Sequence, residues 1–190
     1  MIEILNVTKK YGEQTVLDNF SLTVNDGEKL NITGESGTGK TTLLRILSGL
    51  ESVDNGTVVC EKKTAYMFQE ARLLPWKTAK ENILAVLKKD NYYLADKYLE
   101  AICLSDAADK VPSELSGGMA QRVSFARFLA YAEESGADLL LLDEPFSALD
   151  KGTADKMLDL LLDFAVDKTV ILVTHDADTS EKLGGRVVKL

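Results

Sequence analysis

Four short apolar runs mark the chain, and each is followed at once by polar or glycine-rich residues. The runs are KLNIT at 29–33, TAYMF at 64–68, DLLLL at 138–142 and TVILVT at 169–174. Continuous apolar runs of this length are typical of strands buried on both faces of a largely parallel sheet, although short buried helices give the same pattern. Ligands bind beyond the carboxyl ends of the strands in such sheets. We therefore expect the residues that follow the runs to meet at one edge.

Other segments have different periods. FSLTVNDGEKLNIT alternates apolar and polar residues on either side of Asp26-Gly27, which predicts a hairpin and hence antiparallel strands near the N-terminus. KENILAVLKKD and LADKYLEAICL carry leucines at near-helical spacing, so we expect a helical insert from residue 71 to about 116. Together these patterns predict an α/β fold with a mostly parallel core sheet, an N-terminal antiparallel β-subdomain and a helical subdomain.

Composition narrows the function classes. The 190 residues, 45% of them hydrophobic, predict one domain spanning residues 1–190. The formal net charge of −8 gives no basic footprint for nucleic acid. Cys60 and Cys103 are far apart and suit neither a disulfide framework nor a zinc site, so we expect buried or half-buried thiols. The sequence holds neither a signal peptide nor a membrane span, so any role at a membrane is expected to come through a partner.

The polar stretch after the first run is a phosphate-binding candidate. The spacing of glycine and lysine in GESGTGKT, residues 34–41, matches the P-loop pattern, between a predicted strand and the amphipathic TTLLRILSGL. In a P-loop, backbone N–H groups surround phosphates, Lys40 reaches the outer ones and the Thr41 hydroxyl ligates magnesium. The alternative is a glycine-rich turn that matches by chance. We expect ATP, although a P-loop alone does not select the base.

The other strand ends supply groups for hydrolysis. Asp143 follows four leucines and is placed to hold the magnesium shell, while Glu144 is placed to polarise an attacking water. The alternative is a solvated surface pair. His175, the only histidine, is either a structural residue or a partner of the γ-phosphate or the water. Gln69 is either a polar strand cap or a neutral ligand near magnesium.

A second glycine-containing stretch, LSGGMAQR at 115–122, precedes a predicted helix. Ser116 is either the N-cap of that helix or part of a site for a phosphate held by another molecule, since the P-loop already surrounds one nucleotide. Tyr11, before Gly12, is either a half-buried aromatic of a sheet or a platform that stacks on a nucleobase.

In their order, these motifs resemble the ATP-binding cassette (ABC) ATPases over essentially the whole chain. VTKKYGEQTVLDNFSLTV resembles the adenine-stacking loop, GESGTGKTT the Walker A motif, Gln69 the Q-loop, LSGGMAQR the signature, LLLLDEP the Walker B motif, SALD at 147–150 the D-loop and His175 the H-loop. The resemblance implies that Glu144, His175 and Gln69 are catalytic, and that Thr41, Gln69 and Asp143 surround Mg²⁺. The nucleotide-binding residues that it implies are Tyr11, Gly34, Ser36, Gly37, Thr38, Gly39, Lys40, Thr41, Thr42, Ser116, Gly117, Gly118 and Asp150.

The resemblance also implies an assembly. In that family two cassettes pack head to tail, and each ATP lies between the P-loop of one subunit and the signature of the other. Ser116, Gly117 and Gly118, the second phosphate cradle, would then serve the partner's ATP. The implied active state is a homodimer, or a heterodimer with a similar chain. A γ-phosphate held from both sides would close the pair, and hydrolysis would release it.

The resemblance is compatible with two kinds of cassette protein, a transporter motor and a soluble ATPase. FQEARLLPW together with LSGGM resembles the nitrate, sulfonate and taurine group of bacterial importers, and Leu73, Leu74 and Trp76 are placed to form an apolar groove for a permease helix, or else to pack in the core. This implies a motor at the cytoplasmic face of the membrane, bound to an integral permease and served indirectly by a solute-binding protein. The alternative is a soluble cassette ATPase acting on nucleic acid or ribosomes, which the acidic composition disfavours. A P-loop kinase would leave the signature and D-loop unexplained.

Overall fold

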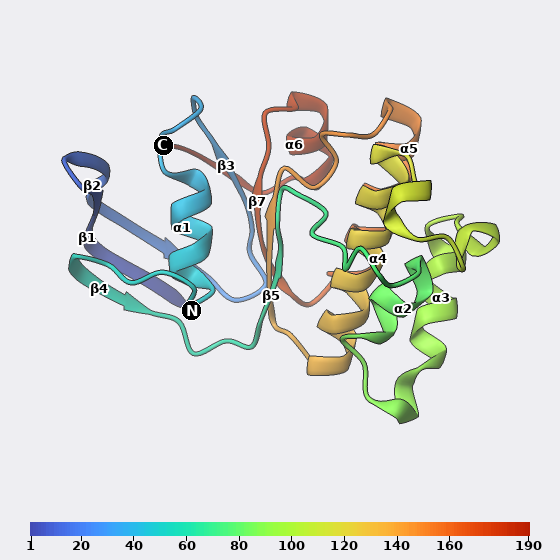
Figure 1. Ribbon diagram of the computed structural model, residues 1–190. Helices are drawn as coiled ribbons and strands as arrows, with labels where there is room; N and C mark the ends of the chain where they lie inside the picture. The colour runs from blue at the N-terminus through green and yellow to red at the C-terminus, as the bar shows by residue number, and fades with distance from the viewer.

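The computed structural model describes residues 1–190 and contains two β-sheets (Figure 1). A three-stranded antiparallel sheet has the order β2-β1-β4, with β1 (Ile2–Tyr11), β2 (Gln14–Val24) and β4 (Asn55–Val59). A five-stranded sheet has the order β5-β6-β7-β3-β8, with β3 (Lys29–Thr33), β5 (Thr64–Met67), β6 (Leu139–Asp143), β7 (Thr169–Val173) and β8 (Arg186–Lys189). Every pairing in the larger sheet is parallel, which confirms the strands predicted from the four apolar runs.

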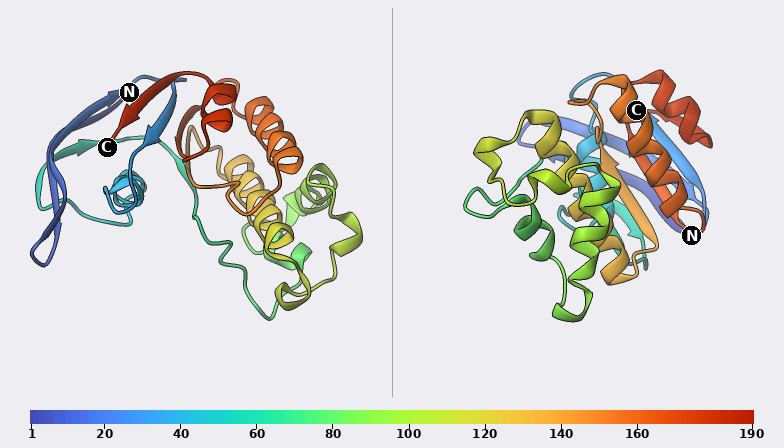
Figure 2. Two further views of the ribbon diagram at one scale, coloured as in Figure 1. Left: turned by 90° about the horizontal axis from the view of Figure 1, so that it is seen from above. Right: turned by 90° about the vertical axis from the view of Figure 1, so that its right-hand side faces the viewer.

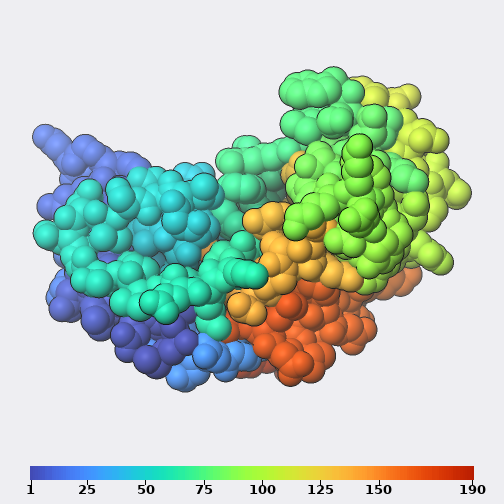
Figure 3. Space-filling view, turned by 90° about the horizontal axis from the view of Figure 1, so that it is seen from below, coloured from blue at the N-terminus to red at the C-terminus, as the bar shows by residue number.

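Six α-helices accompany the sheets: α1 (Lys40–Leu47), α2 (Ala79–Leu84), α3 (Tyr93–Ala101), α4 (Gly117–Ser135), α5 (Lys151–Phe164) and α6 (Ala177–Leu183). Short 3-10 helices span Lys89–Asn91, Ser105–Ala107 and Pro112–Glu114. Helix α1 lies between the two sheets, whereas α2 to α5 gather at the far end of the molecule (Figures 1 and 2). The N-terminal residues and the helical segment accordingly form opposite ends of the surface (Figure 3). None of these helices has the length and apolar character needed to cross a membrane.

The parallel sheet separates two hydrophobic cores, which explains its continuous apolar runs. Leu139 and Leu141 of β6 pack with α1 and the antiparallel strands, while Leu140 and Leu142 pack with α2 to α5. Strand β7 alternates in the same way, with Ile171 among the residues on the α1 side. Because side chains of a strand alternate between faces, a strand that serves two cores needs an apolar residue at every position.

The helix ends are fixed by local capping. Ser116 accepts a hydrogen bond from Met119 N at 3.2 Å and is the N-cap of α4, which confirms its predicted role as a helix cap. Asp150 accepts bonds from Thr153 N and Oγ1, at 3.0 and 2.7 Å, and caps α5. These caps start each helix at a defined residue directly after a functional motif.

Two expectations are wrong. Strands β2 and β3 do not form a hairpin: β2 pairs with β1, and β3 lies between β7 and β8 in the other sheet. Leu30, Asn31 and Ile32 are all buried, so β3 is a central strand with no exposed face. Cys103 is exposed, because it follows the end of α3 in a left-handed turn with φ of 54°.

Candidate nucleotide-binding site

The turn from β3 into α1 forms a glycine cradle. Gly37 and Gly39 have φ of 83° and 94°, backbone conformations that favour glycine. A Cβ on Gly39 would lie 2.5 Å from Val16 O, so only glycine lets the loop approach β2 this closely. Lys40 is the first residue of α1, and its ammonium donates to Gly34 O at 2.8 Å and Glu35 O at 2.6 Å. The loop therefore curls around a cation at a helix N-terminus, which suits phosphate.

A cavity of about 500 Å³ opens over this cradle and brings together residues from separate strand ends. It is lined by Gln14, Val16, Ser36, Gly37, Gly39, Lys40, Thr41, Thr42, Gln69, Asp143, Glu144, Ser147, Val173 and His175. The expected meeting of the P-loop, Gln69, the acidic pair and His175 at one edge of the sheet is thus present in the geometry.

Thr41 and Asp143 form a candidate Mg²⁺ position. The Thr41 hydroxyl donates to Asp143 Oδ2 at 2.7 Å, and neighbouring ligands of an octahedral Mg²⁺ lie about 2.9 Å apart. Burial raises the pKa of Asp143, while its bonds from Thr41 and from the Tyr66 hydroxyl at 3.4 Å oppose that rise. A buried carboxylate with few donors around it is a site that a divalent cation would stabilise. The residues present therefore fit Mg²⁺.

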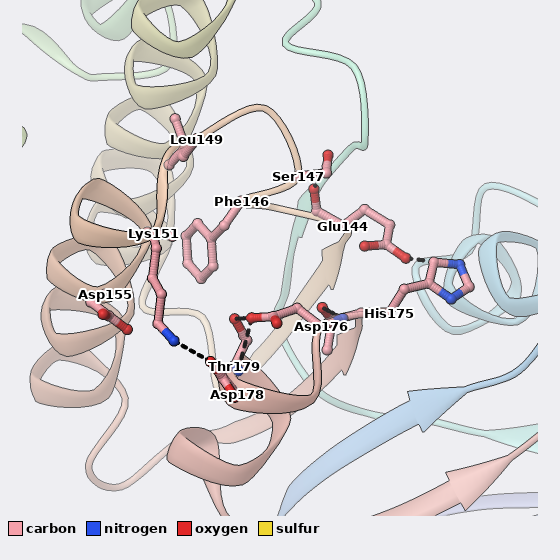
Figure 4. Close-up of a pocket in the computed structure, with 12 residues that line it drawn as sticks. Glu144, Phe146, Ser147, Leu149, Lys151, Asp155, His175, Asp176, Asp178 and Thr179 are labelled. Carbon is pink, nitrogen blue, oxygen red and sulfur yellow. Dashed lines mark hydrogen bonds and ion pairs between the residues drawn. The ribbon is translucent and has the colours of Figure 1, made fainter.

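Glu144 has the features of a general base. Its side chain is largely buried, and burial raises its pKa, which the neighbouring His175 opposes. His175 Nε2 lies 3.2 Å from Glu144 Oε1, and the two side chains point toward one another from the ends of β7 and β6 (Figure 4). Glu144 Oε1 is nevertheless buried without a hydrogen-bond donor. The Glu144 side chain lines the cavity as a whole, which places this carboxylate next to the nucleotide site.

The backbone at Glu144 is strained. Its φ of 47° lies in the left-handed region, which costs about 1 to 2 kcal/mol for a residue with a Cβ. The conformation is held by bonds from Glu144 N to Val173 O at 3.0 Å and from Ser147 Oγ to Glu144 O at 3.1 Å. Strain of this kind persists where the surroundings over-determine it, and it directs the Glu144 side chain toward the cavity.

A second cavity of about 320 Å³, whose lining residues Figure 4 shows, shares Glu144, Ser147 and His175 with the first. Phe146 and Leu149 line its apolar side, and an ion pair between Lys151 and Asp178 joins the starts of α5 and α6. The loop 147–150 and the residues after β7 are thereby tied together at the edge of the site.

Several expected nucleotide-binding residues lie outside the first cavity. Gly34 and Thr38 belong to the cradle but do not line the cavity. Tyr11 is 44% exposed at the end of β1, where it pairs with Gln14, and Lys9 lies 5.3 Å from its ring centre. The remainder lie on the surfaces of the second cradle and the α5 cap: Ser116, Gly117, Gly118 and Asp150.

Sequence reasoning missed some residues of the site. Gln14 and Val16 line the cavity from β2, because the P-loop packs against that strand; they lie in the stretch that resembles the adenine-stacking loop, but that resemblance assigns a role only to Tyr11. Tyr66 lies near Asp143, and Gln121 reaches the backbone at Gln69, yet both resemble ordinary sheet and helix residues in sequence. The polar Gln121, one turn after the glycines of LSGGMAQR, is the one signal that was present.

Comparison with known proteins agrees with this geometry. Residues 17–147 match the model of the ABC transporter family. The chain is 41% identical over its full length to an aliphatic sulfonates import ATP-binding protein of Pseudomonas syringae pv. syringae, of which it covers 69%. It is 42% identical, again over its full length, to a protein of the same name from Nocardia farcinica, of which it covers 77%.

Solved structures are similar over the whole chain. One is a dimeric ATP-binding cassette in a post-hydrolysis state bound to ADP and Pi, with a TM-score of 0.89, 32% identity, and coverage of 100% of this chain and 94% of that one. Another, described as a dimeric bacterial ABC transporter cassette, has a TM-score of 0.86 and 30% identity at the same coverage. Sequence match, fold and the arrangement around Lys40 and Glu144 agree, and the chain belongs to the ABC transporter family as an ATP-binding cassette ATPase.

Proposed function

We propose that this protein is the ATP-hydrolysing motor subunit of a bacterial membrane importer. The observation that carries the proposal is the meeting of Lys40, Asp143, Glu144 and His175 in one cavity at the carboxyl edge of the parallel sheet. The import ATP-binding proteins that the chain resembles along its full length give the process that hydrolysis would serve.

The residues divide the chemistry among them. The P-loop N–H groups and Lys40 would bind the phosphates of ATP, and Thr41, Asp143 and Gln69 would hold Mg²⁺. When bound, Mg²⁺ neutralises charge on the β- and γ-phosphates. Glu144 would accept a proton from the attacking water, because its carboxylate lines the cavity and burial raises its pKa. His175, which contacts that carboxylate, would position it relative to the γ-phosphate.

The second cradle belongs to the nucleotide of a partner. Ser116, Gly117 and Gly118 begin α4 and lie outside the cavity over the P-loop, so they are free to meet phosphate from another subunit. The similar cassettes of known structure are dimeric. A head-to-tail homodimer would hold each ATP from both sides and would separate once the γ-phosphate is gone. Tyr11 would stack on the adenine, and Asp150 would face the partner.

Import requires a partner that spans the membrane, and an apolar groove suits its docking. Tyr66, Met67, Phe68, Val86, Ser124, Arg127, Phe128 and Tyr131 line a groove of about 270 Å³ between β5, the α2 region and α4. Leu73 packs against the larger core and is not free for docking, whereas Trp76 is 73% exposed. We assign the groove and Trp76 to the docking of a cytoplasmic helix of an integral permease, which apolar side chains of this chain would contact.

The helical segment, 71–116, is the subdomain that would carry this docking within the single domain of residues 1–190. The relatives named for aliphatic sulfonates make a small anionic solute of the sulfonate, nitrate or taurine kind the proposed cargo. A solute-binding protein would deliver it to the permease, and the motor would sit at the cytoplasmic face of the membrane.

Co-purification from detergent-solubilised cells tests the proposal. We expect the tagged chain to bring down a polytopic membrane protein in fixed ratio, and Trp76→Glu to lose it. Val166→Glu is the matched control, since Val166 is 71% exposed in the turn before β7. It lies at the amino end of that strand, whereas the nucleotide cavity lies at the carboxyl ends. Recovery of ribosomal or DNA-associated partners without a permease would refute the importer function.

A further inference from the structure

A buried side-chain amide connects helix α4, which begins at the signature residues Ser116 to Gly118, to the nucleotide cavity over the P-loop of the same chain. Gln121 is 4% exposed, and its Nε2 donates to Gln69 O at 3.3 Å and to Pro145 O at 3.0 Å. The amide group has two hydrogens, and both are used. Gln69 and Glu144, the residue before Pro145, line the nucleotide cavity.

One of the two carbonyls, that of Pro145, directly follows a residue with a strained backbone. Glu144 has a φ of 47° and needs its neighbours to hold it, and the Pro145 carbonyl is the next acceptor along the chain. Pro145 has no N–H, so its carbonyl is the one backbone hydrogen-bonding group that this residue offers. Removing the amide would release the backbone directly after the general base.

Helix α4 repeats this arrangement further along. Arg127 donates to Ala71 O at 2.8 Å and to Arg72 O at 3.0 Å, and Arg72 is itself left-handed with φ of 45°. The Arg127 guanidinium is partly buried, and this burial lowers its pKa. Two side chains of one helix thus hold both turns that border the site.

The start of α4 is also close to the loop 147–150. A Cβ on Gly118 would lie 3.3 Å from Ala148 O, so the first turn of the helix has little room to move independently of that loop. Displacement of α4 at its N-terminus must therefore reach the loop 147–150, the Pro145 carbonyl and the Gln69 carbonyl together.

We infer that Gln121 is a positioning residue for ATP hydrolysis, which ties the geometry of Gln69 and Glu144 in one subunit to the helix that meets the ATP of the other. The role rests on the proposed ATPase dimer. Helix α4 of each subunit would contact the ATP in the partner's P-loop and, through Gln121, would also position Gln69 and Glu144 of its own subunit. ATP bound at one site would thereby affect hydrolysis at the other, so the two sites would act cooperatively.

Gln121→Met in the full chain tests this role, because methionine keeps the length of the side chain and removes both donors. We expect kcat for ATP to fall by about ten- to a hundredfold, since small displacements of catalytic groups have effects of that size. The ATP dissociation constant should stay within about threefold, because the P-loop contacts are untouched. The Hill coefficient for ATP should fall toward 1.

Asn82→Leu is the matched control. Asn82 is fully buried, and its amide donates to the carbonyls of Leu74, Lys77 and Thr78, so this variant also loses a buried amide that holds a loop. No residue of that loop lines the nucleotide cavity. The control should lose at least as much thermal stability as Gln121→Met while keeping kcat and the Hill coefficient of the wild type.

Each result decides. An unchanged kcat and Hill coefficient in Gln121→Met would overturn the role of Gln121 while leaving the ATPase intact, and an equal loss in Asn82→Leu would reduce it to general destabilisation. Absence of hydrolysis in the wild type would refute the proposed function and this role with it. If the methionine variant does not fold, Gln121→Glu is measured instead, since its carboxylate is the same size and faces both carbonyls without a donor.

Discussion

The contact between the P-loop and β2 gives a prediction that separates two neighbouring glycines. Gly37 and Gly39 both have φ near 90°, so alanine at either position carries a similar backbone strain. They differ in their surroundings. A Cβ on Gly37 meets no protein atom within 4 Å, whereas a Cβ on Gly39 would lie 2.5 Å from Val16 O and 3.1 Å from Leu17 Cδ2.

The expected magnitudes follow from these distances. The left-handed backbone costs alanine about 1 to 2 kcal/mol at each position. At Gly39 the methyl group must also push the loop away from a paired strand, an overpacking cost of about 1 to 3 kcal/mol. Gly37→Ala should therefore lower the free energy of unfolding by about 1 to 2 kcal/mol and Gly39→Ala by about 2 to 5 kcal/mol.

Urea unfolding followed by circular dichroism measures the difference between the two variants. In thermal melts, the extra loss in Gly39→Ala corresponds to about 2 to 12 °C for a chain of this length. Equal destabilisation by the two substitutions would refute the idea that the approach of Gly39 to Val16 fixes the loop. A more stable Gly39→Ala than Gly37→Ala would refute the structural reasoning altogether.

Two further predictions concern other parts of the chain. Glu144→Gln should bind ATP, hydrolyse it about 10² to 10⁴ times more slowly and accumulate as a dimer in size-exclusion chromatography; unchanged turnover would remove Glu144 from the base role. Tyr98→Phe should cost about 1.5 to 3 kcal/mol in urea at pH 7, because the buried Tyr98 hydroxyl donates to Glu133. Burial raises the pKa of Glu133, but Lys97 and Tyr98 outweigh it and hold that pKa below its usual range. This stabilisation is present above the usual pKa of about 4.3 and is lost as pH falls through the lowered value. The free energies of unfolding of the wild type and of Tyr98→Phe should therefore converge in acid. A difference as large at pH 3 as at pH 7 would contradict the ionic character of the bond.

Much of the parallel sheet was predictable because its information is local. Runs such as LLLLD must be buried on both faces, and parallel strands deliver their carboxyl ends to one edge, so the meeting of Asp143, Lys40 and His175 follows from short segments. The strand β8 escaped notice because Arg186–Lys189 is largely exposed at the sheet edge and lacks an apolar run.

The mistaken hairpin has a different cause. Alternation around Asp26-Gly27 describes β2 correctly, yet the partners of β3 come from residues 170–173 and 186–189, far along the chain. Local patterns carry no information on which strand completes a sheet. For the same reason the polar Gln121 could not be assigned: its acceptors, Gln69 and Pro145, are distant in sequence and are backbone groups that any residue supplies.

The division of β6 and β7 between two cores has a consequence during synthesis. Helix α1 and the antiparallel strands leave the ribosome early, but the surface they pack on includes Leu139, Leu141, Ile171 and Val173, which are made about 90 to 130 residues later than α1. At typical elongation rates this delay is on the order of ten seconds. During that interval the nascent P-loop has no parallel sheet behind it, so the ATP site can form only near the end of synthesis.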